Sequence, residues 1–221
     1  MIEEEVKLTT GPDFSVASYE GLVPGSAVDA DRVTKTLTTY FDTSDFSMTM
    51  RFSSLRFRCA LADLDESLTL HDGVKGTWTI KDGGESSTSD GVISVKRHEI
   101  NVKGAFGDPL EELFSRAEVS TIERELLRPI ARILSNRHST EISLAKERVA
   151  IDDDVANVLS LEDNSIAHTF REIEVELLSE DGGLTLRNAV VAKLIEAGAR
   201  YSESPSKLHL ALSILHPKLG L

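Results

Sequence analysis

The chain has 221 residues, of which 40% are hydrophobic and 28% are charged, so it is long enough to bury one sizeable core. Acidic residues outnumber basic ones by 37 to 24, and the formal net charge of -13 disfavours nucleic acid and anionic lipid as partners. The single cysteine, Cys59, excludes an intrachain disulfide. The acidic start lacks the features of a signal peptide, and no apolar run approaches the roughly 20 residues that cross a bilayer. We therefore expect a soluble, cytoplasmic protein without a membrane partner.

Alternation of apolar and polar residues predicts five strands in the first half of the chain. They cover residues 2–8, 33–41, 55–59, 78–81 and 92–102. Residues 82–91 are rich in Gly, Ser, Thr and Asp and predict a loop. Such a series of short strands favours an antiparallel sheet.

Helical spacing of apolar residues predicts two amphipathic helices next, one around residues 110–114 and one over residues 122–134. Strand patterns resume over residues 137–161, broken by turns, and over residues 169–178.

Two further helices are predicted near the end of the chain, over residues 184–197 and 206–215. A turn at residues 180–183 precedes the first of them, and Gly198 follows it as a cap. No change of composition marks a linker, so we interpret residues 1–221 as a single α+β domain.

Several predicted strands carry charge on one face and apolar side chains on the other, because side chains alternate along a strand. The charged sets are Glu3, Glu5 and Lys7; Arg56 and Arg58; Lys81; and Glu172, Glu174 and Glu176. A sheet with one solvated face would explain any one of these strands. Solvated faces normally mix residue types, however, whereas the arginine face of residues 56–58 and the glutamate face of residues 172–176 each repeat one sign of charge.

Like charges on one face need compensation. Successive carboxylates on one strand face lie about 6.7 Å apart and repel each other by about 2 kcal/mol at an effective dielectric constant near 20. Divalent cations would compensate the carboxylates, and a phosphate-bearing anion would compensate the Arg and Lys side chains. The six histidines are scattered and show no zinc-ligand spacing.

The order of these motifs resembles that of the CYTH superfamily, the triphosphate tunnel metalloenzymes. Glu3-x-Glu5-x-Lys7 resembles the ExExK signature of this family. Further similar segments are residues 40–43, 55–58, 78–81 and 97–99, Arg137, Arg148 with Asp152, residues 171–177, and Ser206-Lys207. Residues 127–131 and 206–208 are most similar to the CYTH part of CYTH–CHAD proteins, and thiamine-triphosphatase-like members are also similar.

The resemblance implies an α+β fold in which eight antiparallel strands form a closed barrel, with a polar tunnel as its lumen and helices packed outside. Such a barrel would explain how strand faces of one charge can point inward. The chain would be one CYTH-like domain, residues 1–221, and could belong to a longer CYTH–CHAD protein.

The resemblance also implies roles for individual residues. Ligands to Mg²⁺ or Mn²⁺ would be Glu3, Glu5, Asp152, Glu172, Glu174 and Glu176. The substrate would be bound by Lys7, Arg56, Arg58, Lys81, Arg97, Arg137, Arg148 and Lys207. Within this second set, catalysis would depend most directly on Lys7, Arg58 and Lys207. The implied reaction is metal-dependent hydrolysis of inorganic tripolyphosphate or of an organic triphosphate such as thiamine triphosphate.

Two other functions would need the same anion-binding residues. One is a class IV-type adenylate cyclase, and the other is a non-catalytic module that binds polyphosphate or nucleotides. Individual residues also have structural interpretations: Glu99 and Glu176 could be structural, and Arg56 or Arg58 could simply pair with a glutamate across the sheet.

Four residues near these motifs are not expected to take part in the chemistry. Asp42 fits a turn at a strand end. Trp78 and Cys59 are expected in the core. Glu4 lies on the face opposite Glu3 and Glu5 and is expected in solvent.

Overall fold

The computed structural model describes residues 2–11, 13–89, 92–118, 122–178 and 184–219, and only the backbone of residues 2–3, 83–89 and 92–93. The strands are β1 (Ile2–Thr9), β2 (Ala27–Asp42), β3 (Ser54–Ala60), β4 (Lys75–Ser89), β5 (Val92–Ala105), β6 (Arg128–Leu144), β7 (Glu147–Leu159), β8 (Ile166–Leu177) and β9 (Arg200–Tyr201). The α-helices are α1 (Glu111–Arg116), α2 (Leu184–Glu196) and α3 (Lys207–Leu215). Short 3-10 helices cover Thr49–Arg51, Leu61–Asp63, Arg124–Leu126 and Pro217–Leu219.

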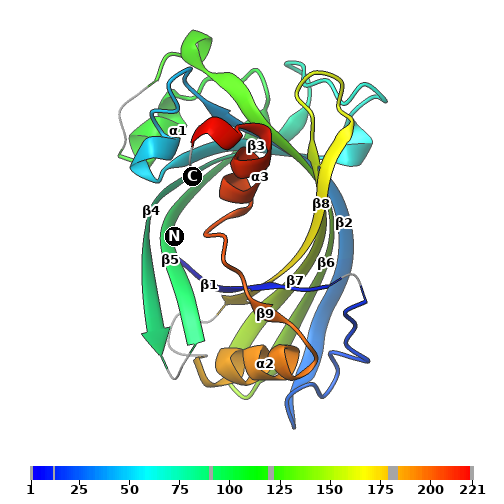
Figure 1. Ribbon diagram of the computed structural model, residues 1–221. Helices are drawn as coiled ribbons and strands as arrows, with labels where there is room; N and C mark the ends of the chain where they lie inside the picture. Colours follow the sequence, from blue (N-terminus) through cyan, green and yellow to red (C-terminus); the bar gives the residue numbers. More distant parts are fainter. Residues whose placement is uncertain (1, 12, 90–91, 119–121, 179–183, 220–221) are drawn as a thin grey trace.

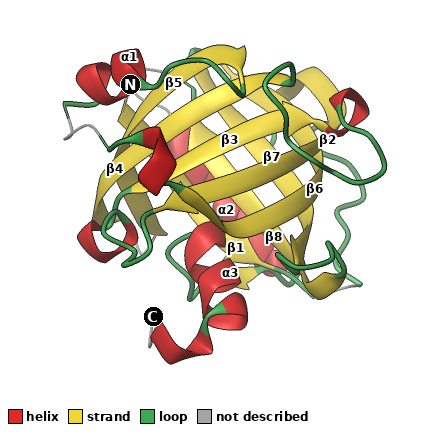
Figure 2. Ribbon diagram, turned by 90° about the horizontal axis from the view of Figure 1, so that it is seen from above, coloured by secondary structure: helices red, strands yellow, loops and turns green. Residues whose placement is uncertain are grey.

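Eight of these strands form a closed barrel (Figures 1 and 2). Antiparallel neighbours follow the order β5-β4-β3-β2-β6-β7-β8-β1. The barrel closes at β1, which pairs with β5 over residues 2–5 and with β8 over residues 5–9. The predicted α+β fold with an eight-stranded antiparallel barrel is therefore confirmed.

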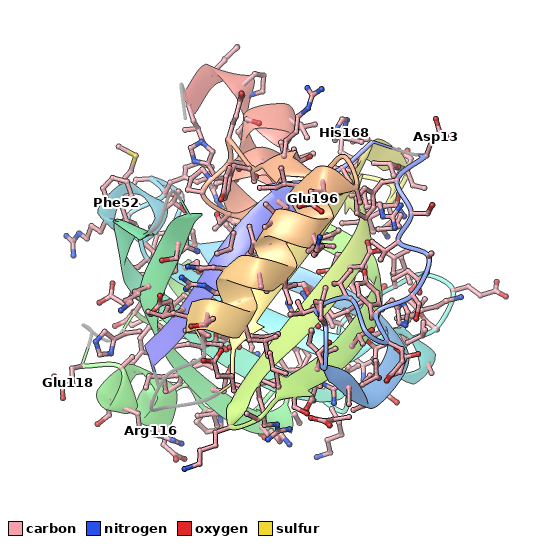
Figure 3. All side chains as sticks on the ribbon, turned by 90° about the horizontal axis from the view of Figure 1, so that it is seen from below. Asp13, Phe52, Arg116, Glu118, His168 and Glu196 are labelled. Atoms are coloured by element: carbon pink, nitrogen blue, oxygen red, sulfur yellow. The ribbon has the colours of Figure 1, made fainter. Side chains whose placement is uncertain are left out.

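The apolar strand faces pack outside the barrel. Val6 and Val175 are fully buried in a cluster with the apolar residues of α2, and Figure 3 shows α2 lying across β1. On another side, Phe57 and Trp78 pack with Phe114 of α1. Because side chains alternate, this packing directs the charged residues between these positions into the barrel.

One mouth of the barrel is covered by α3 and by the segment that leads to it from β9 (Figures 1 and 2). Leu208 and Leu212 of α3 pack with Ile133 of β6 and with Ala156 and Val158 of β7. The lumen is thus apolar at this end and charged further inside.

The structure differs from the helix predicted over residues 122–134. This segment contains only the 3-10 turn Arg124–Leu126, and β6 begins at Arg128. Ile133 packs in the cluster around α3, whereas Leu134 packs on the opposite side of the strand with the core near α1. Both faces of β6 therefore pack against apolar side chains here, so apolar residues fall next to each other and imitate helical spacing.

The prediction of a loop over residues 82–91 was also wrong for residues 82–89, the part that the structure describes. The ladder between β4 and β5 continues to Ser89, with a register shift between Asp82 and Glu85. The intervening Gly83 and Gly84 are therefore accommodated as an irregularity in a strand. Residues 90–91, and the whole of the turn predicted at residues 180–183, lie outside the described residues.

Candidate active site

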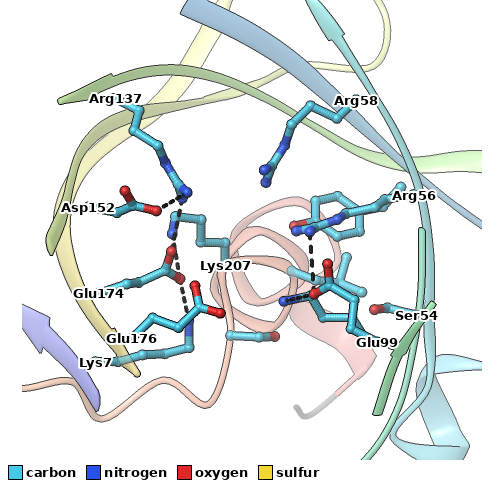
Figure 4. Close-up of a pocket in the computed structure, with 14 residues that line it drawn as sticks. Lys7, Ser54, Arg56, Arg58, Glu99, Arg137, Asp152, Glu174, Glu176 and Lys207 are labelled. Atoms are coloured by element: carbon cyan, nitrogen blue, oxygen red, sulfur yellow. Dashed lines mark hydrogen bonds and ion pairs between the residues drawn. The ribbon is translucent and has the colours of Figure 1, made fainter. Parts of the chain in front are cut away.

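A polar cavity of about 200 Å³ occupies the lumen (Figure 4). Its lining residues are Lys7, Tyr40, Ser54, Arg56, Arg58, Lys81, Glu99, Arg137, Asp152, Glu174, Glu176, Ser206, Lys207 and Leu208. They come from strands all around the barrel and from the start of α3, so barrel closure brings together residues that are far apart in the sequence.

Carboxylates gather on one side of the lumen, which we call the acidic wall. It consists of Glu5 on β1, Asp152 and Asp154 on β7, and Glu172, Glu174 and Glu176 on β8. The pairing register aligns them, because Asp152 lies opposite Glu174, and Asp154 opposite Glu172. Strand alternation and barrel closure together explain this concentration of negative charge.

Lys7 of β1 lies among these carboxylates. Its Nζ contacts Glu174 at short distance, Glu5 Oε1 at 3.0 Å and Glu172 Oε1 at 3.7 Å. Burial would lower the pKa of Lys7, but the three carboxylates outweigh burial and hold the pKa well above its usual value. Lys7 is therefore protonated at neutral pH.

Lys207 reaches the same wall from the first turn of α3. Its neighbour Ser206 caps the helix by accepting a hydrogen bond from the His209 backbone N–H. Lys207 Nζ lies 3.0 Å from Asp154, 2.8 Å from Glu172 and 2.7 Å from Glu174. Burial opposes the charge of Lys207, yet these carboxylates raise its pKa above the usual value.

Arg137 of β6 is the third cation of the acidic wall. Its Nε donates to both oxygens of Asp154, at 3.0 and 3.1 Å, and its other nitrogens donate to Asp152 and to Glu174, the latter at 2.9 Å. Asp154 is 0% exposed. Burial alone would raise the pKa of Asp154, but Lys207 and Arg137 lower it, so the group stays ionised.

The opposite side of the lumen, which we call the basic wall, carries Arg56, Arg58 and Lys81 together with the carboxylate Glu99. Lys81 Nζ lies 2.7 Å from Glu99. Arg58 donates from Nε to Thr38 Oγ1 at 3.1 Å, and within the described part of the chain no carboxylate lies within ion-pair distance of it. The charge of neighbouring Arg56, together with burial and Arg137, lowers the pKa of Arg58 to about 10.

The two walls have opposite excess charge. Among the described side chains, the acidic wall has six carboxylates against the three cations Lys7, Arg137 and Lys207. In the described part of the chain, the basic wall has three cations against Glu99. Excess charge in a confined site is costly unless a ligand neutralises it. The cavity therefore suits a ligand that presents a cation to one wall and an anion to the other.

The acidic wall fits Mg²⁺ or Mn²⁺ by the number and type of its donors, since both ions prefer oxygen ligands. Buried Oε1 atoms of Glu5 and Glu172 accept no hydrogen bond from the described residues. Among those residues, no three carboxylate, His or Cys side chains are already grouped for metal binding, because Lys7 and Lys207 lie between the carboxylates. A cation would compete with these two lysines for the same oxygens.

The structure brings most of the predicted site residues together. The acidic wall contains Glu5, Asp152, Glu172, Glu174, Glu176, Lys7, Arg137 and Lys207, and the basic wall contains Arg56, Arg58 and Lys81. Glu3 occupies a position in β1 opposite Arg97, but its side chain lies outside the described residues.

Two predicted substrate ligands lie apart from the cavity lining. Arg97 donates to the Pro205 carbonyl at 2.6 Å and so ties β5 to the segment before α3. Arg148 is 52% exposed and pairs with Glu141 at 3.0 Å. Neither residue belongs to the lining of the cavity.

Sequence reasoning missed Asp154 and undervalued Glu99. Asp154 follows Asp152 at strand spacing, so alternation alone places both on one face. Glu99 lies in the cavity beside Lys81, and burial of Glu99 is outweighed by Lys81 and Arg56, which lower its pKa to about 2. The expected turn role of Asp42 agrees with the structure, where Asp42 accepts hydrogen bonds from the backbone of Thr43, Met48 and Thr49.

Comparison with known proteins adds a family and a fold. The profile of the CYTH domain matches residues 1–200. HpAC1 from Hippeastrum, named as an adenylyl cyclase with a dominant triphosphatase activity, is 17% identical with a TM-score of 0.52, over 96% of this chain and 95% of that chain. PH1819 from Pyrococcus horikoshii OT3 is 18% identical with a TM-score of 0.52, over 95% of this chain and 98% of that chain. Curated protein sequences give no match. At these identities the two structures support the fold alone.

Proposed function

The chain belongs to the CYTH family, and we propose that it is a metal-dependent triphosphatase. The observation that carries this proposal is the division of one cavity into an acidic and a basic wall, each with excess charge. A metal-bound triphosphate has both the divalent cation and the polyanion that these walls lack.

The basic wall would bind the phosphate groups. Arg56 and Arg58 offer planar donors suited to phosphate oxygens, and Lys81 adds a point charge. The lowered pKa of Arg58, caused first by Arg56 and then by burial, reflects an arginine without a carboxylate partner among the described residues. Bound phosphate would supply that counter-ion. Arg97 and Arg148 remain predicted ligands, each with a protein partner in this structure.

The acidic wall would hold Mg²⁺ or Mn²⁺ through Glu5, Asp152, Glu172, Glu174 and Glu176, with Glu3 as a further predicted ligand. A bound divalent cation would supply charge neutralisation at the phosphate oxygens and a lowered pKa for an attacking water. Glu174 is suited to this role because it is ionised: burial would raise its pKa, but Lys207, Lys7 and Arg137 hold it well below the usual value.

Lys7 and Lys207 would stabilise negative charge on the phosphate undergoing transfer. Their raised pKa values, maintained against burial by the surrounding carboxylates, make them hydrogen-bond donors rather than proton acceptors. No histidine or cysteine is among the described residues that line the cavity, so a covalent phospho-enzyme is not part of the proposal.

Tripolyphosphate and thiamine triphosphate are the proposed substrates. Tyr40 is the single aromatic residue among the described residues that line the cavity, which gives a purine base little to stack on and makes cyclase activity the less favoured alternative. We also propose that residues 1–221 form one domain. Association with a CHAD domain remains a prediction. In the part of the chain that the structure describes, no helix combines the length and apolarity needed to span a membrane.

The test incubates the protein with tripolyphosphate, thiamine triphosphate or ATP in Mg²⁺ or Mn²⁺, and measures both phosphate and cyclic AMP. We expect phosphate release that is lost in Glu174→Gln and retained in Glu196→Gln, a control on the exposed surface of α2. Cyclic AMP without phosphate release would support a cyclase. Tight binding without turnover would support a non-catalytic module.

A further inference from the structure

The largest fully buried side chain in the described part of the protein is Arg187 of α2, outside the barrel. It is 0% exposed, and its NH1 donates to Glu4 Oε1 at 2.6 Å. The other oxygen of Glu4 lies 2.8 Å from Lys96 Nζ on β5. Glu4 was expected in solvent, and this prediction was wrong, because two cations from different elements bind it.

This ion pair lies in the first half of β1, where apolar packing does not fix the register of the strand. Val6 and Leu8 direct the second half of β1 by packing under α2. Residues 3–5 are all glutamate, so a slip confined to this half of the strand, absorbed by a bulge before Val6, would exchange one glutamate for another and leave Val6 and Leu8 in place. A specific partner on the outer face can distinguish Glu4 from its neighbours. Buried polar groups are known to fix the register of packed elements in this way.

The position of Glu4 affects the cavity because side chains alternate between the two faces of β1. With Glu4 held on the outer face, Glu5 lies on the inner face, where its Oε1 is 3.0 Å from Lys7 Nζ. A rotated or slipped β1 would carry Glu5 away from the acidic wall. Figure 3 shows α2 across β1, so the helix is placed to act on this strand from outside.

We propose that Arg187 is a positioning residue for the cavity: by binding Glu4 on the outside of β1, it keeps Glu5 directed at the metal-binding side. This inference rests on the proposed metal-dependent function. It assigns to α2 a role in the site although none of its described residues lines the cavity.

The experiment measures Mn²⁺ binding to the substrate-free protein by electron paramagnetic resonance, at low temperature where circular dichroism confirms that each variant is folded. Arg187→Met should weaken Mn²⁺ binding by about 10-fold, as expected when a residue that orients a ligand is removed. Lys193→Met, which removes an exposed cation from the same helix, should bind Mn²⁺ like the wild type. The double variant Glu4→Val/Arg187→Met should recover binding to within about twofold, since the introduced valine restores apolar alternation with Val6 and Leu8.

The outcomes separate the two proposals. Unchanged Mn²⁺ binding in Arg187→Met overturns the positioning role and leaves the proposed function intact, whereas absence of binding in the wild type overturns both. If Arg187→Met does not fold, the double variant decides: normal binding supports the positioning role, and binding weakened about 10-fold overturns it. A role in stability alone would lower the unfolding midpoint of Arg187→Met without changing its Mn²⁺ affinity.

Discussion

Replacing Arg58 by methionine should stabilise the ligand-free protein, although Arg58 lies in the middle of the proposed site. The guanidinium lies near Arg56 and Arg137, is largely removed from water, and has a pKa lowered to about 10 by these charges and by burial. A cation whose pKa falls on folding is less favourable in the folded state than in the unfolded chain. Methionine keeps much of the apolar stem and removes the charge.

The magnitude follows from the change in pKa. A fall from 12.5 to about 10 corresponds to about 3 kcal/mol of unfavourable interaction. Water in the open cavity screens part of this energy, and the hydrogen bond from Arg58 to Thr38 is lost, which costs about 1 kcal/mol. We therefore expect Arg58→Met to raise the free energy of unfolding by about 1 kcal/mol.

Urea denaturation of the ligand-free protein measures this change, with Arg137→Met as the matched control. Arg137 binds Asp152, Asp154 and Glu174. Its loss leaves buried carboxylates without this counter-ion and should destabilise the fold by about 3–5 kcal/mol. Tripolyphosphate should raise the melting temperature of the wild type and have little effect on Arg58→Met. A destabilisation by Arg58→Met as large as that by Arg137→Met would refute the reasoning, because it would mean that the protein already compensates Arg58.

Three further predictions concern the other charged groups. Glu99 has a pKa of about 2 in the folded protein against 4.5 ordinarily, so its contribution to stability is complete above pH ~4.5 and is lost as the pH falls toward 2. The difference in unfolding free energy between the wild type and Glu99→Gln should therefore be about 1–2 kcal/mol at pH ~7. This difference should disappear as the pH falls from about 4.5 to about 2. Asp154→Asn should destabilise the protein by about 3 kcal/mol in urea, because Arg137 and Lys207 lose a shared counter-ion, whereas Asp163→Asn in an exposed turn should change little. EDTA should abolish phosphate release and Mn²⁺ should restore it, and release that persists in EDTA would contradict a metal-dependent reaction.

The sequence predicted strand faces well where one face of a strand meets an apolar core. Val6 and Leu8 pack outward and Glu5 and Lys7 inward, as alternation requires. Prediction was wrong for residues 122–134 because Ile133 packs on α3, an element far along the chain. The second apolar face of β6 depends on that distant contact, and local spacing carries no information about it.

Most residues of the candidate site were predictable, although Asp154 was missed and Arg97 and Arg148 lie apart from the cavity lining, but the pairing of the site residues was not predictable. The individual strands indicate which charges share a face, yet the division into two walls depends on the order of strands around the barrel. Glu4 and Arg187 illustrate what was missed: they are 183 positions apart, and their ion pair forms only when α2 packs across β1. The sequence alone does not distinguish an exposed glutamate from a glutamate that pairs with a buried arginine.

The two walls differ in how far the protein compensates its own charge. On the acidic wall, Lys7 and Lys207 lie between carboxylates and remain protonated, so the fold can form without a metal ion. These same lysines would raise the cost of the proposed metal binding, since an ion would have to compete with them for oxygens. On the basic wall, Arg58 has no such partner among the described residues. Binding an anion there would relieve the electrostatic repulsion between Arg58 and the neighbouring arginines. If the proposed function holds, stability and metal binding would compete at the acidic wall, whereas stability and anion binding would reinforce each other at the basic wall, so the phosphate groups would contribute more than the metal to the affinity for a metal-bound substrate.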